Sequence, residues 1–197
     1  MCAHCQARKR SIGKRVIKST GIEISTIGKR HLGAALGSEA FKKEFAQEKV
    51  DEWIAQIKVL SKFAVTQQHA AFSAFTHRLQ GRWTFVSRTV PEAGPLLSGL
   101  EKAIREDFVP ALLGRNVSDL ERDLLSLPAR YGGMGISNPC SLAPIAYDFS
   151  RALCAPLMHI VLRQGEEFDP NSLREDQNNI KLEGDKETAR SKGLLLD

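Results

Sequence analysis

Apolar residues recur at helical spacing through most of the chain between residues 38 and 163. The longest stripe comprises Phe41, Phe45, Val50, Trp53, Ile54, Ile57, Leu60 and Ala64. It predicts an amphipathic helix over residues 38–64, with Ser38 as its N-cap. Two further stripes predict a helix over residues 67–86 and another from Pro95 to Pro110, where the missing N–H should kink or end it. The pattern favours a mainly α protein.

A short helix and a tight reversal follow these stripes. Ser118 and Glu121 have the spacing of a capping box, which predicts a helix over residues 118–126. The next segment predicts a structural turn, which depends on Pro128, Gly132, Gly133 and Gly135. Pro139 suits the first position of a last helix, which should run to residue 163 with Pro144 and Pro156 as kink sites.

The two ends differ from this helical middle. Residues 21–36 alternate briefly between apolar and polar positions and predict a small β-hairpin, one face of which carries Ile22, Ile24 and Ile27. Residues 1–20 are basic and residues 166–197 lack a sustained apolar period, so both segments are expected to be disordered. The predicted domain, a hairpin followed by helices, covers residues 21–165.

Charge is distributed unevenly over these segments. The formal charge of +5 divides into +8 over residues 1–43, +1 over residues 44–163 and −4 over residues 164–197. Lysine and arginine concentrated at one end are typical of a surface that binds phosphate. A solvated basic tail without a partner is the alternative interpretation.

No catalytic group can be assigned from the residues. A polymerase holds two metal ions with neighbouring carboxylates, but the chain has no Tyr-X-Asp-Asp, and Glu106-Asp107 lies within a predicted helix. Cys2-Ala3-His4-Cys5 supplies half of a zinc site, whereas Cys140 and Cys154 are too widely separated to supply the other half. We therefore predict no catalytic residue, no cofactor and no metal.

The expected location is intracellular, either cytoplasmic or nuclear. Basic residues Arg8-Lys9-Arg10 occur where a secretory leader would be apolar. The longest apolar run, Ala152 to Leu162, is shorter than the roughly 18 residues of a membrane span. We accordingly expect no membrane segment.

Three motifs together suggest a family. They are Gly28-Lys29-Arg30-His31-Leu32-Gly33-Ala34-Ala35-Leu36-Gly37, Glu121-Arg122-Asp123-Leu124-Leu125 and Ser126-Leu127-Pro128-Ala129-Arg130-Tyr131-Gly132-Gly133-Met134-Gly135-Ile136-Ser137-Asn138-Pro139. They resemble the region that follows the catalytic palm in the reverse transcriptases of animal retrotransposons. The resemblance covers residues 21–143, and the Leu-Pro-X3-Gly-Gly-X-Gly-Ile run is its most specific part.

The resemblance implies two groups of nucleic-acid contacts. The hairpin would position the primer end through Lys29, Arg30 and His31. The helices after it would form a thumb that lies along a duplex through Lys42, Lys43, Lys58, Lys62, Arg78, Arg82 and Arg88. Residues 1–20 are unlike a palm, so the family's catalytic centre is missing from this sequence.

Three functional hypotheses follow. The first is a noncatalytic, thumb-like fragment that binds an RNA or DNA duplex without sequence preference, with any palm supplied by a separate polymerase chain. The second is a helical interaction module whose apolar stripe binds a protein partner or a second copy of itself. The third is a decayed transposon fragment without a selected function.

Overall fold

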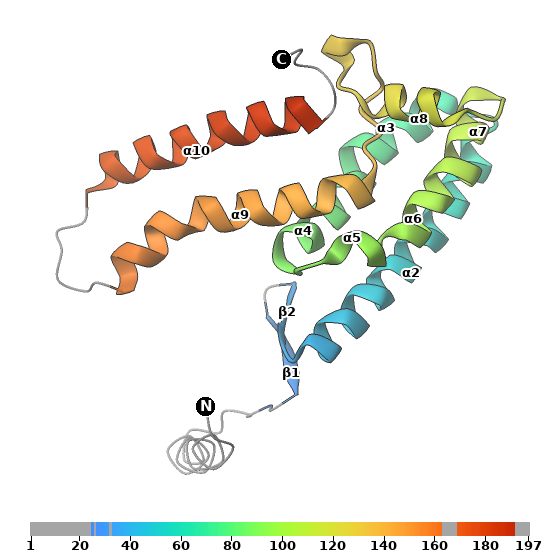
Figure 1. Ribbon diagram of the computed structural model, residues 1–197. Coiled ribbons are helices and arrows are strands. Elements are labelled where there is room, and N and C mark those ends of the chain that lie inside the picture. The colour runs from blue at the N-terminus through green and yellow to red at the C-terminus, as the bar shows by residue number, and fades with distance from the viewer. Residues whose placement is uncertain (1–24, 26, 32, 163–168, 192–197) are drawn as a thin grey trace. The chain divides into compact units, whose positions relative to one another are not determined.

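The structure, a computed structural model, describes residues 25, 27–31, 33–162 and 169–191 (Figure 1). The basic segment 1–20, with its Cys2 and Cys5, lies outside the described residues, as do Ile22 and Ile24. Two compact units divide the chain, residues 1–42 and residues 43–197. The described residues are mainly α with one small two-stranded sheet, as predicted.

The first unit contains the predicted hairpin. Its strands, β1 (Gly28–His31) and β2 (Ala34–Gly37), pair antiparallel, with Lys29 opposite Leu36 and Arg30 opposite Ala35. A Cβ at Gly28 would lie 2.3 Å from a ring carbon of Phe41, so glycine allows this close approach between the strand and the start of the next helix.

The longest predicted helix is confirmed as α2 (Glu39–Ala64), and Ser38 caps it by accepting a hydrogen bond from the Phe41 N–H. The second is α3 (Gln68–Ala74), which continues through a π-helical turn, η2 (Phe75–Leu79), into α4 (Gln80–Thr89). The predicted stripes form the core side of these helices, because Trp53, Phe75 and Trp83 are buried. The spacing of apolar residues therefore predicted both helices and the face of each that is buried.

The third predicted helix is divided into several pieces. They are α5 (Ala93–Leu96), α6 (Ser98–Ala103), the π-helical turn η3 (Ile104–Phe108) and α7 (Val109–Leu113). Pro110 lies inside the continuous helical run instead of ending it. A proline ring clashes with the carbonyl four residues earlier, here that of Glu106, and the widened turn before Pro110 accommodates it.

The remaining elements are α8 (Asp119–Ser126), the 3₁₀ turn η4 (Ala129–Tyr131), α9 (Pro139–Leu162) and α10 (Pro170–Ser191). The capping box of α8 is present, since Glu121 N–H donates to Ser118 Oγ and Ser118 N–H donates to a Glu121 carboxylate oxygen. The helix begins and ends where the sequence predicted it.

The tail departs from the prediction of disorder, because residues 170–191 form α10. Asp169 caps this helix by accepting hydrogen bonds from the N–H groups of Asn171 and Ser172. Its partly buried Leu173 and Ile180 line a shared surface with α9, along which α10 runs back (Figure 1). A polar segment with only a few apolar residues can therefore form a helix when a long neighbouring helix covers those residues.

The core of the second unit is built around aromatic rings. Phe75 stacks on Phe108 with ring centres 4.5 Å apart, and its ring is tilted against that of Trp83 at 5.7 Å. Trp83 also meets Trp53 edge to face at 6.1 Å. Such pairs add about 0.5–1.5 kcal/mol each beyond the area that they bury. The rings join α2, the α3–α4 segment and the η3 turn into one core.

One described helix, α9, has the length and mean hydropathy of a membrane span. Its 24 residues include Pro144, Pro156, Asp148 and Arg151, and its first half packs against α4 and α5. Length and composition of a single helix are weak grounds for a membrane role, because core helices of globular proteins meet the same test. The expectation of no membrane segment stays a prediction.

Candidate functional site

The most basic stretch of the described helices contains no carboxylate. Residues 53–91 include no Asp or Glu, and their charged side chains are Lys58, Lys62, Arg78, Arg82 and Arg88. This stretch forms the second half of α2 and the whole of the α3–η2–α4 segment. All five side chains belong to exposed residues. A surface of this composition has a positive potential that nearby acidic side chains do not cancel.

A shallow groove lies between these two helical segments. Its volume is about 680 Å³, and we call it the α2 groove. It is lined by Glu52, Ala55, Gln56, Val59, Leu60, Phe63, Ala74 and Leu79. Val59 is 69% exposed and Phe63 is 46% exposed, so large apolar side chains face solvent here. The floor of the groove is therefore apolar and open.

Basic side chains border the α2 groove on both sides. Arg78 follows the lining residue Ala74 by four positions, and Lys58 and Lys62 follow Ala55 and Val59 by three, so each lies one helical turn from the lining. Arg82 reaches across the groove and donates a hydrogen bond to Gln56 Oε1 at 3.0 Å. None of these four cations pairs with a carboxylate among the described residues. Four of the predicted contacts thus lie near the α2 groove: Arg82 bonds to a lining residue, and Lys58, Lys62 and Arg78 lie one helical turn from the lining.

Glu52 is the one acidic side chain in the lining of the α2 groove. Its carboxylate accepts a 2.6 Å hydrogen bond from Lys49, and this contact is the main cause that lowers the Glu52 pKa. The charge of Arg82 lowers it further. Glu52 is thus already engaged with Lys49 at one end of the groove.

Other predicted contacts do not join the α2 groove. Arg88 is ten residues beyond Arg78, so it faces a different side of the helix. Lys42 forms an ion pair with Glu39 at 2.9 Å, and exposed Lys43 lies about 22 Å along α2 from Lys58. These three side chains are available to solvent but do not share one surface with the groove.

The hairpin candidates belong to the first unit. Lys29, Arg30 and His31 are exposed residues of β1. Alternation along a strand places Lys29 and His31 on one face of the hairpin and Arg30 on the other. The three therefore do not form a single contact surface within the hairpin.

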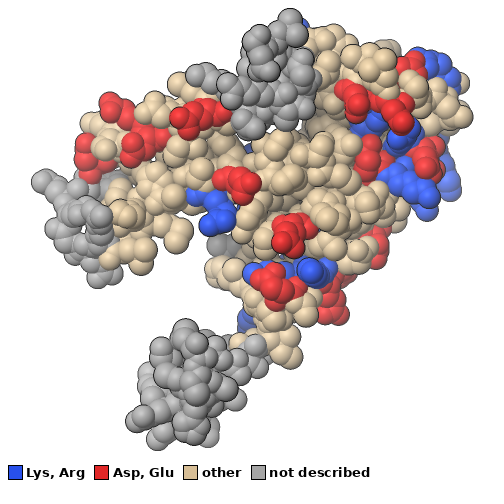
Figure 2. Space-filling model, in the orientation of Figure 1, with Lys and Arg blue, Asp and Glu red and all other residues tan. Residues whose placement is uncertain are grey.

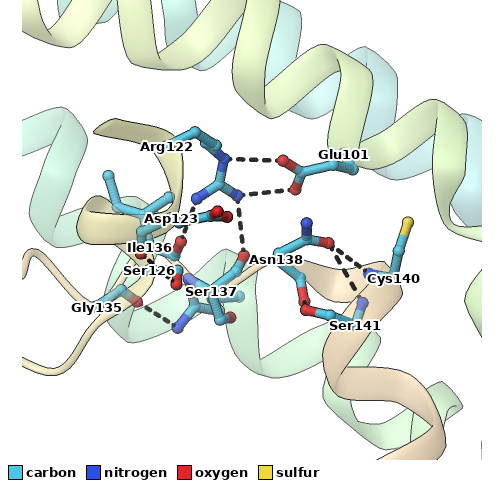
Figure 3. Close-up of polar contacts among 11 residues, drawn as sticks. Glu101, Arg122, Asp123, Ser126, Gly135, Ile136, Ser137, Asn138, Cys140 and Ser141 are labelled. Carbon is cyan, nitrogen blue, oxygen red and sulfur yellow. Dashed lines mark hydrogen bonds and ion pairs between the residues drawn. The ribbon is translucent and has the colours of Figure 1, made fainter. Parts of the chain in front are cut away.

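The predicted structural turn is held by a buried arginine (Figure 3). Arg122, on α8, is only 3% exposed, and its guanidinium binds both carboxylate oxygens of Glu101 on α6 at 2.8 Å. The same guanidinium donates to the carbonyl of Ile136 at 2.7 Å and to that of Ser137 at 3.4 Å. Burial raises the Glu101 pKa, although the hydrogen bonds from Arg122 oppose the rise. One side chain thus connects α6, α8 and the end of the turn.

Backbone hydrogen bonds fix the rest of the turn. The carbonyl of Leu125 accepts from the Ile136 N–H at 3.0 Å, and the carbonyl of Leu127 accepts from the Gly135 N–H at 2.8 Å. A Cβ at Gly133 would lie 2.1 Å from that Leu127 oxygen, so only glycine fits. Gly132 and Gly135 have φ of 79° and 69°, the left-handed region that favours glycine. Each glycine predicted for the turn therefore has a steric reason.

Gln80 connects this turn to the helix that carries the basic residues. Its Nε2 donates to the Gly135 carbonyl at 3.1 Å, and its Oε1 accepts from the Ser137 N–H at 3.2 Å. The two bonds span 55 and 57 residues of sequence. The Gln80 amide thus pairs with one backbone carbonyl and one backbone N–H of the turn, as a neighbouring strand would, and holds α4 against the turn.

Sequence reasoning missed the roles of Arg122, Glu101 and Gln80. Arg122 is flanked by Glu121 and Asp123, a composition that is typical of a solvated helix face. Its partner is 21 residues away, and nothing in the spacing indicates the pair. The one available signal was that Arg122 belongs to a motif that adjoins the glycine-rich turn.

The surface over α6 to α8 has a different charge pattern from the α2 groove. Figure 2 shows basic and acidic side chains interspersed there. The ion pairs of this region join Lys102 to Glu106, Arg105 to Asp119 and Arg115 to Glu121. Arg115 holds the Glu121 pKa down at about 2. Cations that are already paired contribute less to attraction of an anionic partner.

Neither a search for metal ligands nor comparisons with known proteins assign a function to the described residues. Within the described ranges, no three His, Cys, Asp or Glu side chains are grouped as a metal site requires. Burial raises the pKa of the Cys140 thiol, which disfavours its reactive thiolate. Comparisons with protein-family models, curated proteins and solved structures give no match. The resemblance to a reverse transcriptase therefore stays a prediction.

Proposed function

We propose that this chain is a noncatalytic, thumb-like module that grips the phosphate backbone of a nucleic-acid duplex through the α2 groove. The observation that carries the proposal is the carboxylate-free stretch 53–91, whose four cations Lys58, Lys62, Arg78 and Arg82 border one groove. Backbone contacts of this kind carry no sequence information, so binding should be indifferent to sequence.

The apolar floor has a role in the same grip. Exposed Phe63 and Val59 offer surface to the sugars and base edges of a duplex, while the cations on both sides reach the phosphates. The resemblance to the thumb of retrotransposon enzymes supports the same substrate class. Under this proposal the chain is not an enzyme by itself, and any catalytic palm belongs to another polypeptide.

The test is fluorescence anisotropy with a labelled primer-template duplex over a series of salt concentrations. Each phosphate contact contributes about 0.9 to the slope of log affinity against log salt on B-form DNA. Replacing Lys58, Lys62, Arg78 and Arg82 by Gln should therefore reduce the slope by about three to four and weaken binding at every salt concentration.

A matched variant removes the same amount of charge from another surface. It replaces Lys102, Arg105, Arg115 and Arg130 by Gln, and its slope should stay close to that of the wild type. Equal losses in the two variants would show a general charge effect and refute the α2 groove. A third variant, which neutralises Arg8, Lys9, Arg10, Lys14, Arg15 and Lys18, separates the groove from the basic first segment. Affinity that depends only on those six would also refute it.

A protein-interaction module is the second candidate, and one observation favours it. The floor of the α2 groove exposes Val59 and Phe63, which a partner helix or a second copy could cover. This function predicts concentration-dependent mass in light scattering, which Phe63→Asp abolishes. A monomer at all concentrations that binds no hydrophobic dye would count against it.

A further inference from the structure

The amphipathic helix α8 leaves part of its apolar side at the surface, although its Leu125 packs against the core. Leu120 is 71% exposed and Leu124 is 51% exposed, whereas Arg122 on the opposite side is 3% exposed. An amphipathic helix normally buries its apolar stripe. Here the bonds of Arg122 to Glu101 and to the turn bury the arginine, while Leu120 and Leu124 stay at the surface.

These leucines form one side of a groove between α8 and the start of α9. The groove has a volume of about 400 Å³, and we call it the α8 groove. Its lining comprises Leu120, Asp123, Leu124, Ser126, Leu127, Ser137, Asn138, Ser141, Leu142 and Ile145. Five of these residues are Leu or Ile, and the acidic one is Asp123.

The register of α10 on α9 directs the chain towards the α8 groove. A Cβ at Gly184 would lie 2.5 Å from the Phe149 ring, and Gln177 Nε2 donates to the Leu153 carbonyl, so the two helices run antiparallel. Ser191, seven residues after Gly184, is therefore level with Leu142, seven residues before Phe149. Figure 1 shows α10 alongside α9 and ending towards the α8 end of that helix.

We propose that Leu194-Leu195-Leu196 of the same chain docks in the α8 groove. The leucines are three to five residues after Ser191, the end of α10, and a chain of that length can span roughly 10–17 Å. The lining residues Ser141 and Leu142 belong to the first turn of α9, and Ser137 and Asn138 directly precede it, at the end of α9 to which the register brings the chain. The groove is thus within reach of the segment without rearrangement of α10.

The chemistry of the segment matches that of the groove. Three consecutive leucines suit a lining of Leu120, Leu124 and their neighbours, since each buries apolar area that water would otherwise cover. Lys192 precedes the leucines and Asp197 follows them, so the segment adds no net charge beside Asp123 at the groove. The docked segment would cover the exposed leucines of α8. It would also attach the C-terminal end of α10 to the helical domain.

The test is amide hydrogen exchange of the full chain, followed by mass spectrometry of peptides that cover α8. Replacing Leu194, Leu195 and Leu196 by Asp should speed exchange of residues 120–127 about tenfold. The groove variant Leu124→Asp should give a similar increase, and the combined variant should add little to either. Leu182→Asp, at an exposed leucine on α10, is the matched control and should leave α8 unchanged.

Each alternative has its own result. Unchanged exchange in the tail variant, or equal effects of the tail variant and Leu182→Asp, overturns the proposal. Protection of α8 that rises with protein concentration assigns the groove to a second copy and overturns it as well. A synthetic peptide of residues 188–197 that restores protection in the tail variant, where a scrambled peptide does not, supports it independently.

Discussion

The buried pair of Arg122 and Glu101 allows the sharpest test of the fold. Arg122→Met keeps most of the apolar stem but removes the charge and every guanidinium donor. The Glu101 carboxylate then remains largely buried without its partner, and the Ile136 carbonyl loses its 2.7 Å donor. The change therefore disturbs the joint of α6, α8 and the turn while leaving the aromatic core intact.

The magnitude follows from the burial of the groups involved. Removing one partner of a buried ion pair costs about 3–5 kcal/mol, and a buried carbonyl left without a donor costs about 1–3 kcal/mol. The two terms overlap, so we expect a loss of about 4 kcal/mol. For a domain of this size that lowers the melting temperature by about 8–16 °C.

Unfolding three variants in urea separates the cost of the broken ion pair from the cost of the turn carbonyls that lose their donors. Arg122→Met should show the full loss. The double variant Arg122→Met with Glu101→Leu removes both charges, and should remain about 1–3 kcal/mol below the wild type because the turn carbonyls still lack donors. Lys102→Met, which breaks the exposed pair with Glu106, is the control and should cost at most about 1 kcal/mol.

Hydrogen exchange locates the effect of Arg122→Met. The N–H groups of Gly135 and Ile136 should exchange faster, because their bonds to the Leu127 and Leu125 carbonyls depend on the position of the turn. A loss no larger than that of Lys102→Met would refute the reasoning. So would a double variant with the full stability of the wild type, since the turn would then not need its donor.

Three further changes test individual residues. Gly133→Ala should destabilise the protein by about 1–3 kcal/mol in urea unfolding, because the new Cβ meets the Leu127 oxygen. Gly81→Ala should stabilise it by about 0.5–1 kcal/mol in the same assay, since Gly81 is exposed in a helix and its Cβ has open space. The Glu121 pKa falls from 4.5 to about 2 on folding, so its stabilisation is complete above pH 4.5 and is lost as the pH falls towards 2. Glu121→Gln should flatten the stability curve in that range, and an unchanged acid limb would contradict the assignment.

The helices could be predicted because their signals are local. The stripe that contains Trp53 and Ile57 repeats within one helix, and the capping box of Ser118 and Glu121 spans a single turn. The glycine-rich turn was recognisable for the same reason. By contrast, the π-helical turns at Phe75–Leu79 and Ile104–Phe108 depend on how neighbouring helices pack, and the hydrophobic period does not reveal them.

The candidate site was only partly accessible from the sequence. Lys58, Lys62, Arg78 and Arg82 were all predicted as basic contacts, but their grouping near one groove depends on the pairing of α2 with the α3–α4 segment. Arg122 shows the limit more clearly. Its own helix favours burial of Leu120 and Leu124, and only bonds to residues 14 and 21 positions away turn the arginine inward.

Gln80 couples the turn to the proposed binding surface. It lies two residues before Arg82 in α4, so the two side chains point about 160° apart around the helix. The bonds of Gln80 to Gly135 and Ser137 hold one side of the helix against the turn, and Arg82 lies on the other side, where it bonds to Gln56 of the α2 groove. The glycine-rich turn itself depends on the bonds of Arg122 to the Ile136 carbonyl and to Glu101. The rotation of the helix that carries Arg82 is thus fixed by the uncharged bonds of Gln80 to the turn and, through the turn, by the buried pair of Arg122 and Glu101.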